Sequence, residues 1–492
     1  MLQFHRNRLE RSTMFKLSNV GFHQSAEAQK LDDAQLMPWE ANKRLWPSLV
    51  DIIIIVVMSL LLYWGAWVRY AAAGLPEPAK YRCYALAFWK GTANLGDIPR
   101  TDCWFLSLSS SASLINHLQA GGFPSIFIKL IELQSPAKPF HALPHEYPLL
   151  SIIPFTLTML APSHWYLLVF AIWMSLIAGG VYFMLKRFKS SGAAIAFVVY
   201  LVVGSWVTAL ARFDLVPAAL TLGAVMLAER ARWKWAFVLL ALATLLKFYA
   251  LVLILPLFIA QQKQCSGARW FSWRRWDGFA RFIAVCVVVT TISLLLNVDG
   301  TLGSLAYFKD RPIQVEAFQA GLLWLGSFLG YSLQFVYSFG SGNVLSELSS
   351  PVSLGATLCF VAGLCYTYWL QWRGRLDVAT ASLVALLVAT VTAKVFSPQY
   401  LIWVTPFVAY MGKSNWKWLA SWGGVAVLTS FIYPYIYTLA SATPGVISVG
   451  QIPAFYPAVL LRGAIMLGII FALLYQAVRI KASRQSSLVS PS

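Results

Sequence analysis

An acidic residue beside a histidine stands where a long polar stretch of this chain gives way to an apolar run. Glu146 follows His145 and precedes Tyr147 and Pro148. A carboxylate held at a membrane surface could accept the proton of a hydroxyl group, as a general base acting on a lipid-linked substrate must do. Glu146 could instead anchor the stretch through hydrogen bonds to backbone amides. The same stretch offers three other acids for the role of base, which are Asp97, Asp102 and Glu77.

Four basic residues lie within apolar runs or at their edges, which are Arg212, Lys247, Lys394 and Arg462. Ionisable groups at membrane depth are costly and therefore indicate function by default. Together these cations could hold an anion inside the bilayer, and a lipid phosphate is the obvious one. Arg212 could instead be neutralised by Asp214. Lys394 and Arg462 could also extend their charged ends to the membrane surface.

The elements that must position these residues are membrane helices. Of the 492 residues, 59% are hydrophobic and only 12% are charged, whereas soluble domains carry about 25% charged residues. Roughly 20 apolar residues cross a bilayer, and such runs recur from Leu49 to Val478. We therefore predict an all-α polytopic membrane protein with about 11–13 membrane helices.

The net charge of +19 is carried mostly by short basic clusters at the ends of apolar runs. Such clusters mark cytoplasmic ends under the positive-inside rule, and they indicate contact with membrane lipids rather than with nucleic acid. We expect a multi-pass protein of the plasma membrane with both termini in the cytoplasm. The predicted divisions are a tail over residues 1–46, a transmembrane domain over 47–478 with outer stretches at 70–146 and 299–350, and a tail over 479–492.

The apolar run 235–261 has basic clusters on both sides and Lys247 at its centre. We expect a hairpin of two short helices, or one broken helix, that returns to the cytoplasmic side. Irregular backbone at that depth is tolerated only beside protein or a wet cavity. Cys83 and Cys103 lie in the first outer stretch, where they could pair in an oxidising compartment or remain two thiols. No cysteine or histidine cluster has zinc-ligand spacing, so no metal site is predicted.

Six short motifs follow one another along the chain. They are 145–148 (His-Glu-Tyr-Pro), 212–218 (Arg-Phe-Asp-Leu-Val-Pro-Ala), 228–230 (Ala-Glu-Arg), 241–249 (ending Lys-Phe-Tyr), 314–316 (Gln-Val-Glu) and 394–400 (Lys-Val-Phe-Ser-Pro-Gln-Tyr). In their order and spacing the chain resembles the polyprenyl-phosphate-mannose-dependent mannosyltransferase-like family. That family (glycosyltransferase family 87) belongs to the GT-C superfamily of membrane glycosyltransferases.

The resemblance implies a GT-C-like helical bundle with a long structured first outer loop. It also implies an enzyme of the hexosyltransferase class. Such an enzyme moves a hexose such as mannose, or a pentose, from a polyprenyl-phosphate donor to a lipid or glycan acceptor at the outer face, by a single inverting displacement. The polyprenyl-phosphate sugar is a substrate, so no cofactor is implied, and the need for a divalent metal stays open.

Within this resemblance, a carboxylate of the first outer loop is the base. Family members place an aspartate shortly after the first span, whereas residues 76–84 of this chain contain none. We rank Glu146 first as the base, with His145 beside it able to share a proton. The other three acids of the loop follow.

The remaining site residues divide by the group that each would bind. The donor phosphate is assigned to Arg212, Lys394 and Lys247. The acceptor or the sugar is assigned to Asp214, Gln314, Glu316, Gln399 and Tyr400. The alternative function is a flippase or transporter that uses the same cations to move a lipid phosphate or glycolipid without chemistry. The long outer loop favours the enzyme, because a transporter has less need of an asymmetric cap.

Overall fold

The computed structural model describes residues 47–73, 77–95, 103, 105–106, 119–120, 124–162, 164–267 and 269–486. The candidate bases Asp97 and Asp102 and the predicted tail 1–46 lie outside these described residues. The chain divides into two compact units, Met1–Ile52 and Ile53–Ser492. In the first unit, Ser48 donates its amide and hydroxyl hydrogens to Asp51 Oδ2. The second unit holds the elements and the site described below.

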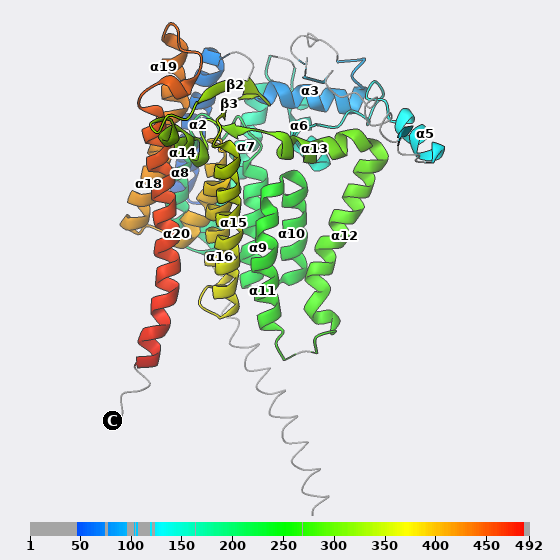
Figure 1. Cartoon of the computed structure of the whole chain (residues 1–492). Helices are drawn as coiled ribbons and strands as arrows, with labels where there is room; N and C mark the ends of the chain where they lie inside the picture. The colour runs from blue at the N-terminus through cyan, green and yellow to red at the C-terminus, as the bar shows by residue number, and fades with distance from the viewer. Residues whose placement is uncertain are drawn as a thin grey trace, which may run out of the picture. The chain divides into compact units, whose positions relative to one another are not determined.

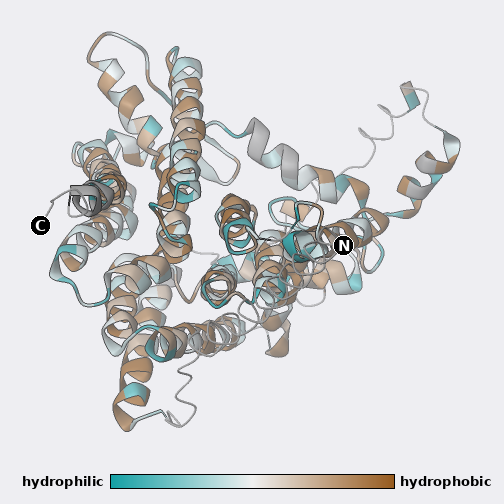
Figure 2. Ribbon diagram, turned by 90° about the horizontal axis from the view of Figure 1, so that it is seen from below, coloured by the Kyte–Doolittle hydropathy of each residue, from teal (hydrophilic) through white to brown (hydrophobic). Residues whose placement is uncertain are grey.

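Among the described residues, six helices are long and apolar enough to cross a membrane. They are α2 (Leu49–Ala73), α7 (Tyr166–Phe188), α12 (Trp273–Leu296), α15 (Ser349–Trp372), the kinked helix made of α18 (Trp416–Ser430), η5 (Phe431–Ile436) and α19 (Tyr437–Ala442), and α20 (Phe455–Ser486). Hydrophobic residues occur on most of the helices in the view from below (Figure 2). The prediction of an all-α polytopic membrane protein is therefore confirmed.

Shorter apolar helices pack among the long ones. They are the stretch Leu149–Leu160 (η2, α6 and η3), α8 (Ser191–Ser205), α9 (Leu215–Glu229), α10 (Trp233–Leu246), α16 (Val378–Thr392) and α17 (Tyr400–Gly412). Small residues let these helices approach closely, as is common in membrane bundles. A Cβ added to Gly204 of α8 would lie 2.9 Å from the Cβ of Ala426 of α18. A larger residue at this position would therefore push the two helices apart.

The predicted break in the run 235–261 takes the form of a hairpin. α10 ends at Leu246, η4 (Phe248–Leu253) forms the bend, and α11 (Ile254–Gln264) runs back. The indole of Trp233, at the start of α10, donates to Gln264 at the end of α11 over 2.6 Å. The two ends of the hairpin therefore meet, and both basic clusters lie on one side.

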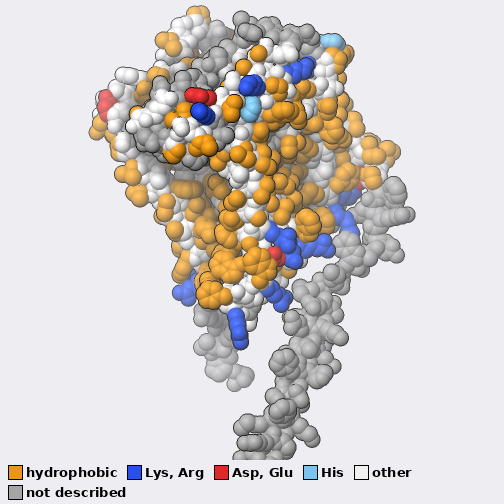
Figure 3. Space-filling view, turned by 90° about the vertical axis from the view of Figure 1, so that its right-hand side faces the viewer, with side chains coloured by type: hydrophobic (Ala, Val, Ile, Leu, Met, Phe, Trp, Pro, Cys, Tyr) orange, Lys and Arg blue, Asp and Glu red, His pale blue; other side chains and the backbone are white. Residues whose placement is uncertain are grey.

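α3 (Glu77–Lys90), α13 (Val298–Asp310) and a small sheet lie together at one end of the helices (Figure 1). The Cys83–Cys103 disulfide ties α3 to the outer loop, so these cysteines are paired rather than free. The loop also contains α5 (Ser125–Leu133). In Figure 3, Lys and Arg side chains gather at the opposite end of the face shown. The second unit therefore has one end capped by the outer loop and one rich in basic residues.

The sheet has three antiparallel strands in the order β1-β3-β2. In the chain, β1 comes before α14 (Phe318–Ser327), and β2 and β3 come after it. The strands are β1 (Ile313–Gln314), β2 (Gln334–Ser338) and β3 (Ser341–Leu345). Phe339 and Gly340 form the turn between β2 and β3 with φ angles of 53° and 68°. A two-residue type I′ turn needs positive φ at both positions. This sheet was not predicted from the sequence, because strands this short show no clear alternation of apolar and polar residues.

Candidate active site

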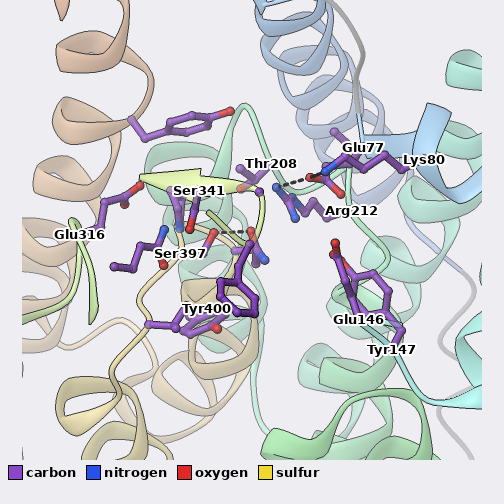
Figure 4. A pocket seen from close by; sticks show the side chains of 18 of the residues that line it. Glu77, Lys80, Glu146, Tyr147, Thr208, Arg212, Glu316, Ser341, Ser397 and Tyr400 are labelled. Carbon is purple, nitrogen blue, oxygen red and sulfur yellow. Dashed lines mark hydrogen bonds and ion pairs between the residues drawn. The ribbon is translucent and has the colours of Figure 1, made fainter. Parts of the chain in front are cut away.

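A polar cavity of about 530 Å³ lies at the capped end of the second unit (Figure 4). Its walls come from segments far apart in the sequence: α3, the 146–148 turn, the 207–212 segment, the β2–β3 hairpin, the 395–400 segment, and the kink between α18 and α19. Eight of the residues predicted from the sequence line it, which are Glu77, Glu146, Arg212, Lys247, Gln314, Glu316, Gln399 and Tyr400. The fold therefore brings most of the predicted site into one place.

Glu77 lies between two cations on one side of this cavity. Its carboxylate contacts Arg212 over 3.0 Å and Lys80 over 3.6 Å. Burial disfavours the charged carboxylate, but the positive charges of Arg212 and Lys80 outweigh burial and lower the pKa of Glu77. An acid held in its ionised form by two partners is a weak base. Glu77 therefore fits the role of general base poorly.

Glu146 lies near this cluster and in a different environment (Figure 4). It is partly buried and lines the cavity. Its carboxylate makes no hydrogen bond or ion pair with another described residue, so the alternative of an anchor to backbone amides gains no support. Burial raises the pKa of Glu146, although the nearby Lys80 charge offsets part of the effect. This is the environment that a general base requires.

His145 does not line the cavity. A Cβ added to Gly303 of α13 would lie 3.2 Å from its Nδ1, so the imidazole faces α13. Burial lowers the pKa of His145. The expectation that His145 shares a proton with Glu146 is therefore not matched by the geometry, because the two side chains face different surroundings.

Arg212 and Asp214 do not neutralise each other. Arg212 pairs with Glu77, whereas Asp214 accepts hydrogen bonds from Lys247 Nζ and from the indole of Trp403, each over 2.5 Å. Asp214 is fully buried and does not line the cavity. Its position suits the support of Lys247 rather than contact with a sugar. Lys247 still lines the cavity, but its charge is balanced.

Glu316 lies across the cavity from Glu146 (Figure 4). It is 2% exposed, and its Oε1 accepts a hydrogen bond from the Tyr437 hydroxyl over 2.7 Å. Arg462 donates to the Glu316 backbone carbonyl over 2.7 Å, and its guanidinium lies 3.7 Å from the centre of the Phe396 ring. Arg462 is therefore held inside the protein and does not extend to the membrane surface. Burial raises the pKa of Glu316 to about 7, with partial offset from Arg462.

Arg311 also lines the cavity, although it was not among the site residues predicted from the sequence. Arg311 donates to the Ser341 hydroxyl over 2.8 Å and lies 5.6 Å from the Tyr307 ring centre. Its buried Nε finds no hydrogen-bond partner among the described residues. No described carboxylate pairs with it. It is thus better placed than Arg212 or Lys247 to receive an anionic ligand.

The signal for Arg311 was present but ambiguous. In the sequence Arg311 follows Lys309 and Asp310, and three charged residues in a row are typical of a solvated segment. Its place in the site depends on the β2–β3 hairpin, which folds Ser341 back against it. Other cavity-lining residues that were not predicted as site residues are Lys80, Tyr307, Ser341, Ser397 and Tyr437.

A second cavity of about 430 Å³ adjoins the first, because Lys247, Phe248 and Tyr400 line both. Its other walls are mostly apolar and come from α15 and α16, including Phe360, Leu386 and Ala389. Lys394 lines this apolar cavity and not the polar one. The site therefore joins a polar, charged cavity to an apolar cavity.

No group of three or more His, Cys, Asp or Glu residues in the described part of the chain is placed to hold a metal ion. The need for a metal is not decided by this observation. The charged groups that line the polar cavity are cations and carboxylates.

Comparison with known proteins gives little further guidance. No family model matches the chain, and no curated protein matches it. Among solved structures, the chain is similar to the crystal structure of ArnT from Cupriavidus metallidurans in the apo state. The two are 15% identical with a TM-score of 0.37, over 87% of this chain and 77% of that chain. The function proposed next rests on the geometry of the site.

Proposed function

We propose that this protein is a GT-C-like membrane glycosyltransferase. It takes a sugar from a polyprenyl-phosphate donor and transfers it to a hydroxyl group of a lipid or glycan acceptor at the outer face of the plasma membrane. One observation carries the proposal. A polar cavity with an unpaired arginine and a carboxyl of raised pKa adjoins an apolar cavity, and a lipid-linked phosphosugar has matching polar and apolar parts.

The donor would lie across both cavities. Its prenyl chain fits the apolar cavity beside Phe360 and Leu386, and its phosphate would contact Arg311 in the polar one. Charged groups make the stronger hydrogen bonds to phosphate oxygens. Arg212 can add a second positive charge, because Glu77 occupies only part of its guanidinium. Lys394 would lie along the chain rather than at the phosphate.

The reaction would be one inverting displacement. The acceptor oxygen attacks the anomeric carbon as Glu146 takes the hydroxyl proton. The bond between that carbon and the phosphate oxygen breaks on the opposite side, and polyprenyl phosphate leaves with the electron pair. Fixed cations that stabilise the leaving phosphate act only where charge develops, which is how such sites lower a barrier. Arg311 and Arg212 supply that charge here.

The sugar and the acceptor would be bound by the cavity residues opposite Glu146. Gln314, Glu316, Gln399 and Tyr400 all line that part of the chamber, and the Oε1 atom of Gln314 and the Oε2 atom of Glu316 lack hydrogen-bond partners among the described residues. Hydroxyl groups of a sugar could satisfy both oxygens. A hexose, with mannose as the first choice, or a pentose would serve.

The test is a transfer assay with purified protein in liposomes. Polyprenyl-phosphate mannose and polyprenyl-phosphate arabinose, each with a labelled sugar, are supplied with a lipid and glycan extract. We expect the label to move to an acceptor and polyprenyl phosphate to appear in equal amount. If the donor stays intact and only changes leaflet, the protein is a flippase and the proposal fails.

A further inference from the structure

A third cavity, of about 560 Å³, lies between α8 and α18 and is built from other residues than the two described above. Roughly 300–1,000 Å³ is the usual range for ligand pockets. A Cβ added to Gly423 would meet no atom within 4 Å, so the space beside this glycine is open. One face of each helix forms the walls, which include Ile195, Ala196, Val199, Tyr200, Val203, Leu419, Ala420, Gly423 and Val427. The result is an apolar groove along the two helices.

One end of this groove is positively charged. Gly192 and Ser414 line that end, where α8 begins and α17 passes into α18. Lys413 and Lys417 flank Ser414, are exposed, and pair with no carboxylate of the described residues. Two acids lie near Tyr410. Glu229 accepts a hydrogen bond from the Tyr410 hydroxyl, and Asp377 accepts one from the Thr380 amide. This end therefore complements an anionic group.

A buried polar atom in the groove wall points to the same kind of ligand. Tyr200 is 1% exposed, and its hydroxyl finds no hydrogen-bond partner in the described part of the chain. Tyr200 lines the groove on the same helix, α8, as Gly192 at the charged end. A buried hydroxyl without a partner is costly. A carbonyl oxygen of a ligand would remove that cost.

We propose that the α8–α18 groove binds one anionic phospholipid. An acyl chain lies along the groove, the phosphate contacts Lys413 and Lys417, and the Tyr200 hydroxyl donates to an ester carbonyl. This site is separate from the polar cavity and does not depend on the proposed glycosyl transfer.

The experiment is native mass spectrometry on the full-length protein in detergent. The protein is mixed with phosphatidylglycerol and phosphatidylcholine that carry the same acyl chains. We expect one phosphatidylglycerol to be retained in preference to phosphatidylcholine. Each lysine near an anionic membrane surface contributes about fivefold in affinity, so the Lys413→Gln/Lys417→Gln variant should lose most of the preference. Glycerol phosphate, which has the head group without chains, should not displace the lipid.

Matched variants separate the groove from general electrostatics. Gly423→Leu should fill the groove and abolish retention, whereas Gly468→Leu, at another open glycine, should not. Arg269→Gln/Arg274→Gln removes two exposed charges from the same basic end, in the loop before and the first turn of α12, and should leave the preference unchanged. The lysine variant alters only exposed side chains and tests the proposal even if Gly423→Leu fails to fold. Equal retention of both lipids, or equal loss in the arginine variant, would overturn it.

Discussion

At the scale of single residues, the site assigns different roles to two carboxyl groups through their surroundings. Glu77 is held between Arg212 and Lys80, and Glu146 lines the same cavity without such a partner. The neighbouring cations lower the pKa of Glu77 and keep its carboxylate ionised, whereas burial raises the pKa of Glu146. Environments that push the pKa values of neighbouring acids apart are a common basis for dividing catalytic work.

The first prediction concerns the base. Glu146→Gln should lower turnover by about a hundredfold to ten-thousandfold, the usual range for a general base, and should leave donor affinity nearly unchanged. Transfer kinetics with labelled donor measure both quantities. Glu132→Gln, at an exposed acid of α5, is the matched control. Near-normal turnover in Glu146→Gln would return the role to Asp97, Asp102 or Glu77.

The second prediction concerns Arg311. Charged hydrogen bonds contribute roughly 1.5–3 kcal/mol each, so Arg311→Ala should weaken the binding of polyprenyl phosphate by about tenfold or more. Titration of the purified protein with polyprenyl phosphate measures the dissociation constant. Lys138→Ala removes an exposed charge of the outer loop and should have no effect. An unchanged dissociation constant in Arg311→Ala would place the phosphate elsewhere.

The third prediction is a pH dependence of stability. Burial raises the pKa of Glu316 to about 7 from its ordinary value of 4.5. The folded protein therefore binds this proton more tightly than the unfolded chain, and stability should fall as the pH rises from about 4.5 to about 7. In Glu316→Gln this fall should be smaller. Thermal unfolding in detergent across that window tests it, and an identical pH dependence in both proteins would contradict it.

At the scale of elements, apolar runs bounded by charge were readable from the sequence. Among the apolar runs that recur from Leu49 to Val478, those that form α7, α9 and α16 are each one continuous apolar helix. The hairpin at Lys247 was one of two forms expected from the basic clusters on both sides of the run 235–261, and Asp214 proves to be the partner of Lys247. The sheet could not be foreseen, and neither could the role of Arg311, because that role depends on strand pairing between distant segments.

The fourth prediction concerns the disulfide that ties α3 to the outer loop. A bridge across a separation of 20 residues typically stabilises by about 2–4 kcal/mol. Because α3 carries Glu77 and Lys80, Cys83→Ser/Cys103→Ser should lower both the unfolding temperature and the turnover. Cys359→Ser removes an exposed free thiol and serves as control. If reductant leaves the unfolding temperature of the unaltered protein unchanged, the bridge has no stabilising role.

At the scale of the whole molecule, helix count and orientation were harder to read than fold class. The described residues form six long helices and six shorter apolar stretches. A stretch such as Leu149–Leu160 reaches only about 18 Å at 1.5 Å per residue, which is less than the thickness of the bilayer core. Hydropathy therefore does not distinguish the short stretches that cross the membrane from those that do not. Whether the number of spans is odd or even does not follow from hydropathy.

The fifth prediction concerns the orientation of the protein in the membrane. The charge distribution predicts that the capped end faces outward and the basic end faces the cytoplasm. A membrane-impermeant maleimide added to intact cells should label Lys138→Cys in the outer loop but not the native Cys265, which lies between α11 and α12. Labelling of Cys265 alone would reverse the orientation and place the proposed reaction on the inner face.

The two adjoining cavities have a kinetic consequence for the proposed reaction. In the proposed reaction, the donor and the spent carrier would share the apolar cavity beside α15 and α16, whereas the acceptor would need only the polar cavity. Polyprenyl phosphate that accumulates in the bilayer would therefore compete with fresh donor and leave acceptor entry open. Flux through the enzyme would then follow the rate at which the cell recycles its carrier lipid, whatever the supply of acceptor.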